Sequence, residues 1–156
     1  MLHIWRALWD RDGQGVGSSL IARLAIAVAV GAVAVAVQAA LRLLGVPYVW
    51  GGASRHGVDC SGLVLVAYAA AGIALPHYSG FQFADTMRVP LATLEPGDIL
   101  FCGPAGDEHE TLYLGDGRVI QAERPGTTVT ITPVWFGPGF AGAGRPMVTP
   151  RSATSG

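Results

Sequence analysis

Residues 48–65 read YVWGGASRHGVDCSGLVL and contain the turn and helix start around which we expect the domain to fold. Its glycines predict a tight turn, and Asp59 predicts the N-cap of a helix that begins at Cys60 and stops at Gly72. The first turn of a helix has free N–H groups and a positive dipole end, which stabilise an anion. We therefore expect this position to lower the pKa of the Cys60 thiol and to make its sulfur nucleophilic.

Cys60 also has a simpler interpretation. A free cysteine is often a small buried hydrophobic residue, and Asp59 would then be an ordinary helix cap. The Asp-Cys-Ser-Gly run behind a Gly-Gly turn, with a histidine later in the chain, favours the nucleophile. The other cysteine, Cys102, ends an apolar run and is expected to pack in a strand. The sequence leaves open a Cys60–Cys102 disulfide, which would consume the nucleophile.

The composition limits the class of protein. A chain of 156 residues holds one domain with a sizeable core. It is 51% hydrophobic and 13% charged, with a formal net charge of −1. Because there is no basic stripe, we expect no nucleic-acid partner.

An apolar segment near the N-terminus raises the hydrophobic content. Residues 24–37 form an unbroken apolar run, and accepting Gln38 extends it to Leu41, close to the roughly 20 residues of a membrane-spanning helix. Residues 34–36, Ala-Val-Ala, are similar to a signal-peptidase site. Three interpretations stay open: a cleaved signal, an uncleaved anchor, or a buried first helix of the domain. Arginines ahead of the run would keep the N-terminus cytoplasmic and the rest of the chain outside.

These patterns divide the chain into three segments. We expect residues 1–35 to be a signal or membrane anchor, residues 36–147 the folded domain, and residues 148–156 a flexible tail. Membrane contact is expected through residues 20–41.

The second half of the chain predicts strands after a short helix at residues 79–87. The strands are expected at residues 99–102, 109–114, 119–120, 127–132 and 140–147. The dipeptide Asp116-Gly117 between two apolar runs is a strong hairpin signal. Helices followed by antiparallel strands predict an α+β fold.

A cysteine hydrolase needs a base for the thiol proton and a group that orients this base. His109 opens a strand, and the hairpin turn brings it near Gln121 on the next strand. The amide oxygen of Gln121 can then accept the imidazole N–H. The other histidines are weaker candidates, since His56 and His77 lie in predicted loops and His3 precedes the apolar run.

The Asp107-Glu108-His109-Glu110 run also raises the question of a metal site. No second histidine or cysteine pair completes a zinc set. We therefore expect neither a metal nor a cofactor.

Four motifs, in this order, resemble those of the NlpC family of papain-like cysteine endopeptidases, which cut peptidoglycan stem peptides. They are GVPYVWGG at 45–52, DCSGLV at 59–64, LEPGD at 94–98, and His109 ahead of YLG at 113–115. The resemblance covers about residues 36–147. It implies a papain-like NlpC fold, with N-terminal helices packed on a central antiparallel sheet of about five strands.

The resemblance also implies an activity and a location. The enzyme would be secreted or anchored in the cell membrane facing the cell wall, and it would cut stem peptides next to D-glutamate or diaminopimelate. The roles carried over by position are nucleophile for Cys60, base for His109, orienting residue for Gln121, and contacts to the amino end of the substrate for Tyr48, Asp59 and Ser61.

Two residues depart from the family pattern. Glu110 follows the histidine where an apolar residue is usual, and a buried carboxylate is costly unless it is paired. We therefore expect the strand to be displaced locally, or Glu110 to reach water. His77 stands where the family often has an arginine beside the cleft.

Two other functions are compatible with these motifs. Misplacement of His109 by Glu110 would leave a wall-binding module without turnover. A wall-cutting domain for phage, conjugation or toxin delivery would carry the same residues. No particular oligomeric state is predicted.

Overall fold

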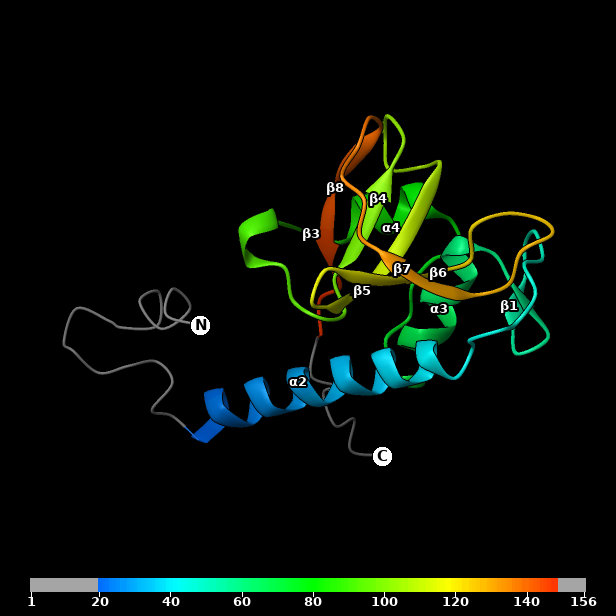
Figure 1. Ribbon diagram of the computed structural model, residues 1–156. Coiled ribbons are helices and arrows are strands. Elements are labelled where there is room, and N and C mark those ends of the chain that lie inside the picture. Colours follow the sequence, from blue (N-terminus) through cyan, green and yellow to red (C-terminus); the bar gives the residue numbers. More distant parts are fainter. Residues whose placement is uncertain (1–19, 149–156) are drawn as a thin grey trace. The chain divides into compact units, whose positions relative to one another are not determined.

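The computed structural model describes residues 20–148 (Figure 1). The chain divides into two compact units, of which the larger comprises residues 32–148. Most of the expected signal or anchor segment (residues 1–19, with His3) and the expected tail from residue 149 onward lie outside the described residues.

Helix α2 (Leu20–Leu41) is continuous over 22 residues. Among the helices of residues 20–148, it alone is long and apolar enough to cross a membrane, over Ala22–Leu41. Large apolar side chains near its start are exposed, whereas Ala36, Ala39 and Ala40 near its end are buried. The apolar run is therefore not simply a core helix, because only its last turns contribute to the core.

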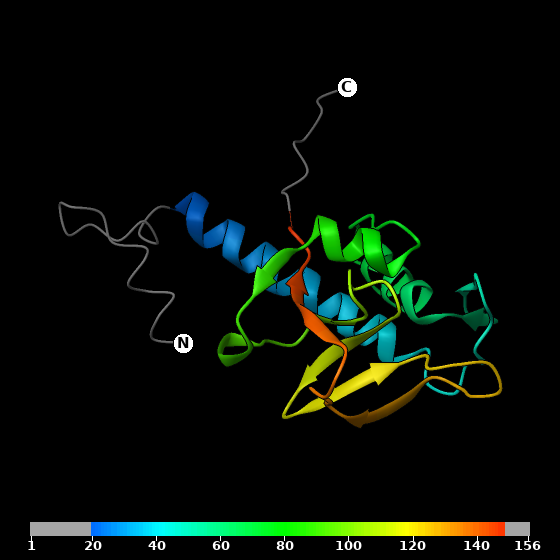
Figure 2. The ribbon, with the colours of Figure 1, turned by 90° about the horizontal axis from the view of Figure 1, so that it is seen from above.

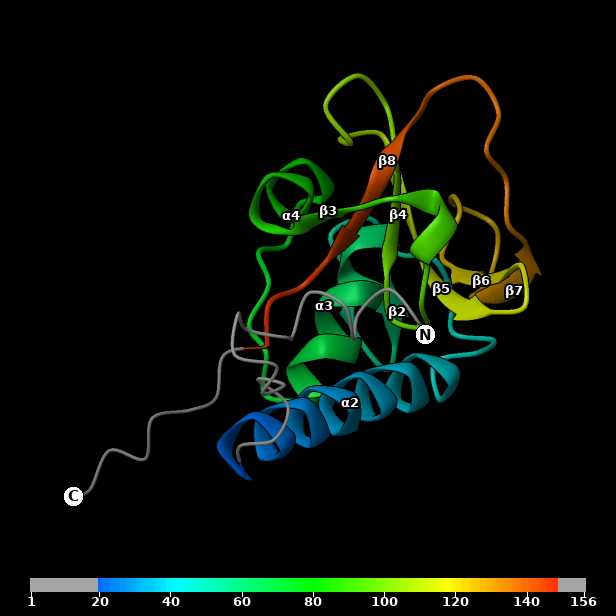
Figure 3. The ribbon, with the colours of Figure 1, turned by 90° about the vertical axis from the view of Figure 1, so that its left-hand side faces the viewer.

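A six-stranded antiparallel sheet forms most of the larger unit, in the order β3-β8-β4-β5-β6-β7 (Figures 1 and 3). A separate two-stranded ribbon precedes the cysteine helix, and two α-helices and one 3-10 helix lie between the ribbon and β4. The strands are β1 (Ala53–Ser54), β2 (Gly57–Val58), β3 (Met87–Val89), β4 (Ile99–Cys102), β5 (His109–Gly115), β6 (Arg118–Gln121), β7 (Thr130–Pro133) and β8 (Phe140–Arg145), and the helices are α3 (Cys60–Ala70), α4 (Ser79–Asp85) and η2 (Leu91–Thr93).

The α+β class expected from the sequence is confirmed, with six strands where about five were expected. The additional strand is β3, which pairs with β8 at the edge of the sheet (Figure 2). It has three residues, and only Val89 is buried. Such a short strand has too few positions to show the alternation that reveals a strand in sequence.

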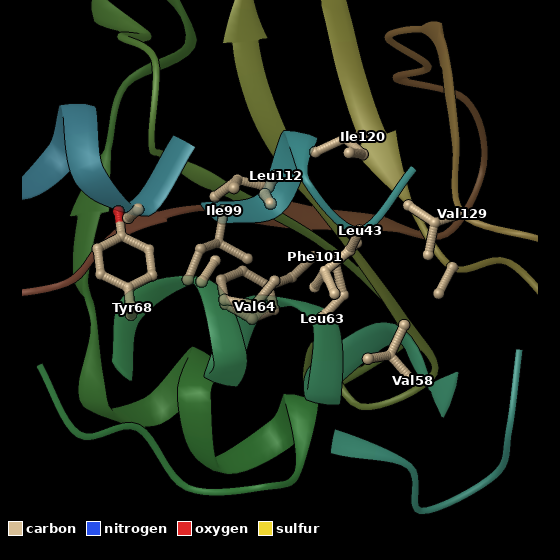
Figure 4. Close-up of a cluster of buried hydrophobic side chains, with 14 residues drawn as sticks. Leu43, Val58, Leu63, Val64, Tyr68, Ile99, Phe101, Leu112, Ile120 and Val129 are labelled. Atoms are coloured by element: carbon tan, nitrogen blue, oxygen red, sulfur yellow. The ribbon is translucent and has the colours of Figure 1, made fainter. Parts of the chain in front are cut away.

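Helix α3 packs against one face of the sheet and forms the main core with it (Figure 4). Almost all of its side chains are apolar, which matches its burial. The core combines residues from α3, the end of α2 and the central strands, among them Leu43, Leu63, Val64, Tyr68, Ile99, Phe101, Leu112 and Ile120. The opposite face of the sheet carries a smaller cluster of Val89, Leu100, Val119 and Ala143.

The β5–β6 hairpin sets the register at the future site. Asp116 and Gly117 both have positive φ, 50° and 69°, as a two-residue turn of this kind requires. Leu112 then pairs with Ile120, with a register shift between Tyr113 and Gly115. The start of β5 and the end of β6 are therefore brought to the same end of the sheet.

Candidate active site

The Asp59 carboxylate connects the glycine turn to the first turn of α3. Its Oδ1 accepts the backbone N–H of Gly62 at 2.7 Å, as an N-cap does, and its Oδ2 accepts the N–H of Gly51 at 2.8 Å. The backbone N–H of Asp59 donates to the carbonyl of Gly52 at 3.1 Å. These bonds hold Cys60, the first residue of the helix, against the turn.

Gly62 is required by the close approach of this turn. A Cβ at position 62 would lie 1.9 Å from the carbonyl oxygen of Gly52 and 2.9 Å from Oδ1 of Asp59. The backbone of the turn can therefore cross the helix start only because Gly62 has no side chain.

Two further side chains bind Asp59. The Ser61 hydroxyl donates to Oδ1 at 3.3 Å, and Nε2 of His77 lies 2.9 Å from the same oxygen. His77 comes from the loop after α3, and Gln82 of α4 holds this loop, because its Nε2 donates to the carbonyls of Pro76 and Ser61. The sequence placed His77 in a loop, and the family resemblance placed it beside the cleft, but nothing local indicates its contact with Asp59 across 18 positions.

The sulfur of Cys60 lies against β5. It accepts the backbone N–H groups of Glu110 and Ser61, so the residue after His109 is directly beside the thiol. Burial, and then the negative charge of Glu110, raise the pKa of the thiol to about 11, with a smaller contribution from Asp59. The expectation of a lowered thiol pKa is therefore wrong: the two N–H groups act in the expected direction, but burial and nearby carboxylates outweigh them.

His109 and Gln121 are joined by a hydrogen bond of 2.8 Å between Nε2 and Oε1. The Gln121 amide is oriented by its other end, because Nε2 of Gln121 donates to the Thr132 hydroxyl at 2.8 Å. With the oxygen of Gln121 facing the imidazole, Nε2 of His109 is the donor of this bond. This tautomer leaves Nδ1 of His109 as the free base nitrogen.

Two further residues singled out in the sequence are Tyr48, which lies near the start of α3, and Cys102, which pairs with His109. Tyr48 forms a bridge with Val58, and burial together with the charges of Cys60 and Asp59 raises its pKa. Cys102 is a free thiol opposite His109 in the β4–β5 ladder, and Cys60 is free as well. The open possibility of a Cys60–Cys102 disulfide is thus not realised. Residues 20–148 contain no group of three side chains arranged to hold a metal ion.

Glu110 is fully buried, and neither expected accommodation is found. Strand β5 is in regular register with β4, where Glu110 pairs with Phe101 and His109 pairs with Cys102, so the strand is not displaced. The side chain does not reach water either, because its exposure is 0%. Burial, and secondarily the charge of Asp59, raise the pKa of Glu110 to about 8.

A helix that begins at a cysteine and packs on an antiparallel sheet carrying a histidine is the arrangement of the papain-like cysteine peptidase fold. The chain belongs to the NlpC/P60 family, whose family model matches residues 45–137. This match includes Cys60, His109 and Gln121.

Mycobacterial proteins are among the relatives of the chain. It is 42% identical over 104 residues to the peptidoglycan endopeptidase RipA of Mycobacterium tuberculosis, covering 58% of this chain and 22% of RipA. The solved structure of the peptidoglycan hydrolase RipB of the same organism superimposes with a TM-score of 0.73 at 35% identity, covering 88% of this chain and 74% of the RipB structure. The chain spans less than half the length of the curated relatives, 22% for RipA and 43% for RipB.

Structures of RipA mutated at a cysteine, at a histidine and at a glutamate also match, each at 34% identity and covering 77% of this chain and 64% of the RipA structure, with TM-scores of 0.71 to 0.72. The three mutated positions have the same spacing as Cys60, His109 and Gln121. RipD of M. tuberculosis, described as a non-catalytic NlpC/p60 protein adapted to peptidoglycan binding, matches at 30% identity with a TM-score of 0.67, covering 74% of this chain and 98% of RipD.

Replacement of Glu110 by valine tests the cost of this buried carboxyl. We expect Glu110→Val to raise the free energy of unfolding by about 1–3 kcal/mol near pH 5, because it removes a buried polar group without a partner. The raised pKa of Glu110 means that the folded wild type keeps a proton that the unfolded chain loses, so wild-type stability falls as the pH rises from 4.5 to about 8. The gain from valine should therefore grow over that range.

Denaturant unfolding of both proteins between pH 5 and 9 measures this gain. The exposed Glu123 provides the control, since Glu123→Val should change stability by less than about 0.5 kcal/mol. Equal stability of wild type and Glu110→Val at every pH would show that the carboxylate is solvated.

Proposed function

We propose that this chain is a cysteine endopeptidase that hydrolyses amide bonds in peptidoglycan stem peptides, with Cys60 as nucleophile, His109 as base and Gln121 as the orienting residue. The observation that carries the proposal is that the thiol of Cys60, at the start of α3, lies against β5. The N–H of Glu110 contacts the sulfur, and the adjacent His109 is held by Gln121. The matching spacing of the cysteine, histidine and glutamate mutated in RipA supports these roles.

The raised pKa of Cys60 defines the first step. At neutral pH the thiol is protonated, so Nδ1 of His109 has to remove the proton as the sulfur attacks the carbonyl carbon. The carbonyl oxygen becomes an oxyanion, which the backbone N–H of Cys60 at the helix start can stabilise. His109 then gives its proton to the leaving amine, and an acyl-enzyme remains.

Deacylation uses the same groups in the reverse order. His109 takes a proton from water as the water oxygen attacks the thioester carbonyl, and it then gives this proton to the sulfur of Cys60, which leaves as the new carboxyl group forms. The hydrogen bond from Nε2 of His109 to Gln121 keeps the imidazole in one orientation through both steps.

Tyr48, Asp59 and Ser61 are proposed to hold the amino end of the stem peptide. Four donors already meet the Asp59 carboxylate, and the imidazole of His77 is its solvent-facing donor, with 29% of the side chain exposed. A substrate ammonium group would therefore bind Asp59 by displacing His77, which preserves the bonds that build the turn.

A wall-binding module without turnover is the second candidate. The raised thiol pKa favours it, because a thiol that ionises at about pH 11 is a poor nucleophile unless the base acts efficiently. RipD shows a non-catalytic protein with this domain. Both candidates share the fold and the substrate surface, and they differ in whether a bond is cut.

The apolar helix is proposed to place the domain outside the cytoplasm. Residues 22–41 have the length and mean hydropathy, 2.4, of a membrane span, and the large side chains near the start of α2 are exposed. A signal or an anchor explains exposed apolar surface on a helix better than a soluble fold does. The catalytic domain would then face the cell wall.

The mutation Cys60→Ala tests turnover against binding. We expect the full-length protein to release fragments from purified sacculi and Cys60→Ala to release none, because the fold does not need the sulfur whereas acyl transfer does. Mass analysis of the fragments identifies the bond. Cys102→Ala is the matched control and should keep wild-type activity. Binding to sacculi without any fragment release by the wild type would favour the binding module, and release by Cys60→Ala would contradict the thiol mechanism.

The role of Gln121 is tested by a graded series. Gln121→Ala should lower kcat, but by at least about tenfold less than Cys60→Ala, because it removes an orienting hydrogen bond and leaves nucleophile and base in place. Gln121→Glu should retain more activity than alanine, since a carboxylate oxygen also accepts the imidazole N–H. The exposed Thr130, paired with Gln121 in β7, is the control position: Thr130→Ala should be neutral. Wild-type turnover by Gln121→Ala would remove Gln121 from the site.

The location is tested by fractionation and by the mass of the mature protein. We expect the wild type in the membrane fraction at full mass, or exported with a new N-terminus near residue 37. A double variant with Val28→Arg and Val30→Arg should stay in the cytoplasm, because both side chains are exposed and charges oppose insertion. A full-mass wild-type protein in the soluble cytoplasmic fraction would refute the proposal.

A further inference from the structure

The buried carboxyl group of Glu110 has no hydrogen-bond partner, and its charge acts on the Cys60 thiol. Within residues 20–148, the buried side-chain polar atoms that lack a partner are both oxygens of Glu110 and Oε1 of Gln82. All three are acceptors when the carboxyl is ionised. A proton on Glu110 turns one of its oxygens into a donor and removes the uncompensated charge, so full burial without partners favours the neutral acid.

The ionisable groups that act on Glu110 make its negative charge still less favourable. The carboxylate of Asp59, at the start of α3, repels the ionised form of Glu110, and ionised Glu110 in turn disfavours the thiolate form of Cys60. His77 binds Asp59 rather than Glu110.

Among residues 20–148, no cation stabilises the ionised form of Glu110, and Arg88 of β3 stacks on the rings of Phe83 and Phe101. On β5 itself the neighbour is His109, which is bound to Gln121, and β4 supplies Cys102, opposite His109. The acid of α4, Asp85, is exposed, and Arg118 of β6 pairs with Gly115 at the far end of β5.

We infer that Glu110 is a positioning residue that keeps its proton in the active form of the site and, on losing it, suppresses formation of the thiolate at Cys60. The inference deepens the proposed function, because it identifies what limits the nucleophile. The backbone N–H of Glu110 contacts the sulfur, so the same residue supplies a favourable dipole and, when ionised, an unfavourable charge. The two contributions oppose each other at one atom.

The order of the two ionisations follows from their environments. Glu110 has a pKa of about 8 and the thiol one of about 11, so a rise in pH ionises the carboxyl first. The resulting charge then makes thiolate formation harder in the range where an ordinary thiol, with a pKa near 8.5, becomes reactive. The reactivity of Cys60 should therefore begin to rise at a higher pH than that of an ordinary cysteine. It should also rise at a higher pH than in a variant without this carboxyl.

Alkylation of the full-length protein by iodoacetamide tests this coupling. The rate is followed from about pH 6 to pH 10.5, and peptide masses resolve labelling at Cys60 from labelling at Cys102. We expect Glu110→Gln to move the Cys60 profile to lower pH by about one unit, which is about a tenfold faster reaction on the rising part of the curve. The Cys102 profile in the same samples should not move.

Glu108 gives a matched control, because burial, and then the charge of Glu108, raise the pKa of Cys102. Glu108→Gln should shift the Cys102 profile to lower pH and leave that of Cys60 unchanged. A Cys60 profile that is identical in wild type and Glu110→Gln would overturn the inference. A purely structural role of Glu110 would shift both thiols or neither.

Infrared difference spectra of the wild type provide a second measurement that does not depend on the variant folding. Ordinary carboxyl groups are already ionised at pH 6.5. A carbonyl band of a neutral carboxylic acid that disappears between about pH 6.5 and 9.5 would therefore report Glu110, and its absence would overturn the inference.

Neither readout needs peptidoglycan. If the wild type leaves sacculi intact while Glu110→Gln shifts the Cys60 profile, the proposed hydrolysis fails and the coupling of Glu110 to the thiol is supported.

Discussion

The carboxylate of Asp59 is the interaction on which the site depends. One buried side chain receives the N–H groups of Gly51 and Gly62, the hydroxyl of Ser61 and the imidazole of His77. An ionised group can be buried only if donors replace its hydration, and here the donors come from the turn, the helix start and the loop after the helix. Asp59 therefore sets the position of the cysteine by joining three segments of the chain.

Glu110 is also a buried carboxyl group, but it lacks the hydrogen-bond donors that Asp59 has. It acts electrostatically on both Asp59 and Cys60, yet neither of its oxygens has a partner among residues 20–148. The donors of the turn and of the helix start already bind Asp59. A second negative charge nearby therefore has no donor left to bind it. The site thus stabilises one carboxylate, Asp59, and disfavours ionisation of a second, Glu110. It disfavours the thiolate of Cys60 for the same reason.

Local chemistry accounts for what the sequence could predict. The Asp-Gly turn predicted the β5–β6 hairpin, the Asp-Cys-Ser-Gly run predicted a helix starting at Cys60, and all five expected strands overlap strands of the sheet. The missed features depend on distant neighbours. Strand β3 exists because β8 pairs with it, and His77 binds Asp59 because Gln82 anchors the intervening loop. The predicted direction of the thiol pKa shift was wrong because the helix-dipole argument considers only α3. Burial of the thiol and the carboxyl of Glu110 on β5 have the larger effect on this pKa.

Gly62 has a consequence for protein engineering. A carbon added at position 62 would overlap the carbonyl oxygen of Gly52. A library that varies the residues around Cys60 should therefore keep Gly52 and Gly62 fixed. Trp50, which is 85% exposed, and His77 can be varied without disturbing the backbone bonds of the turn. Substrate preference can then be changed through side chains around Cys60, while the two glycines preserve the geometry of the nucleophile.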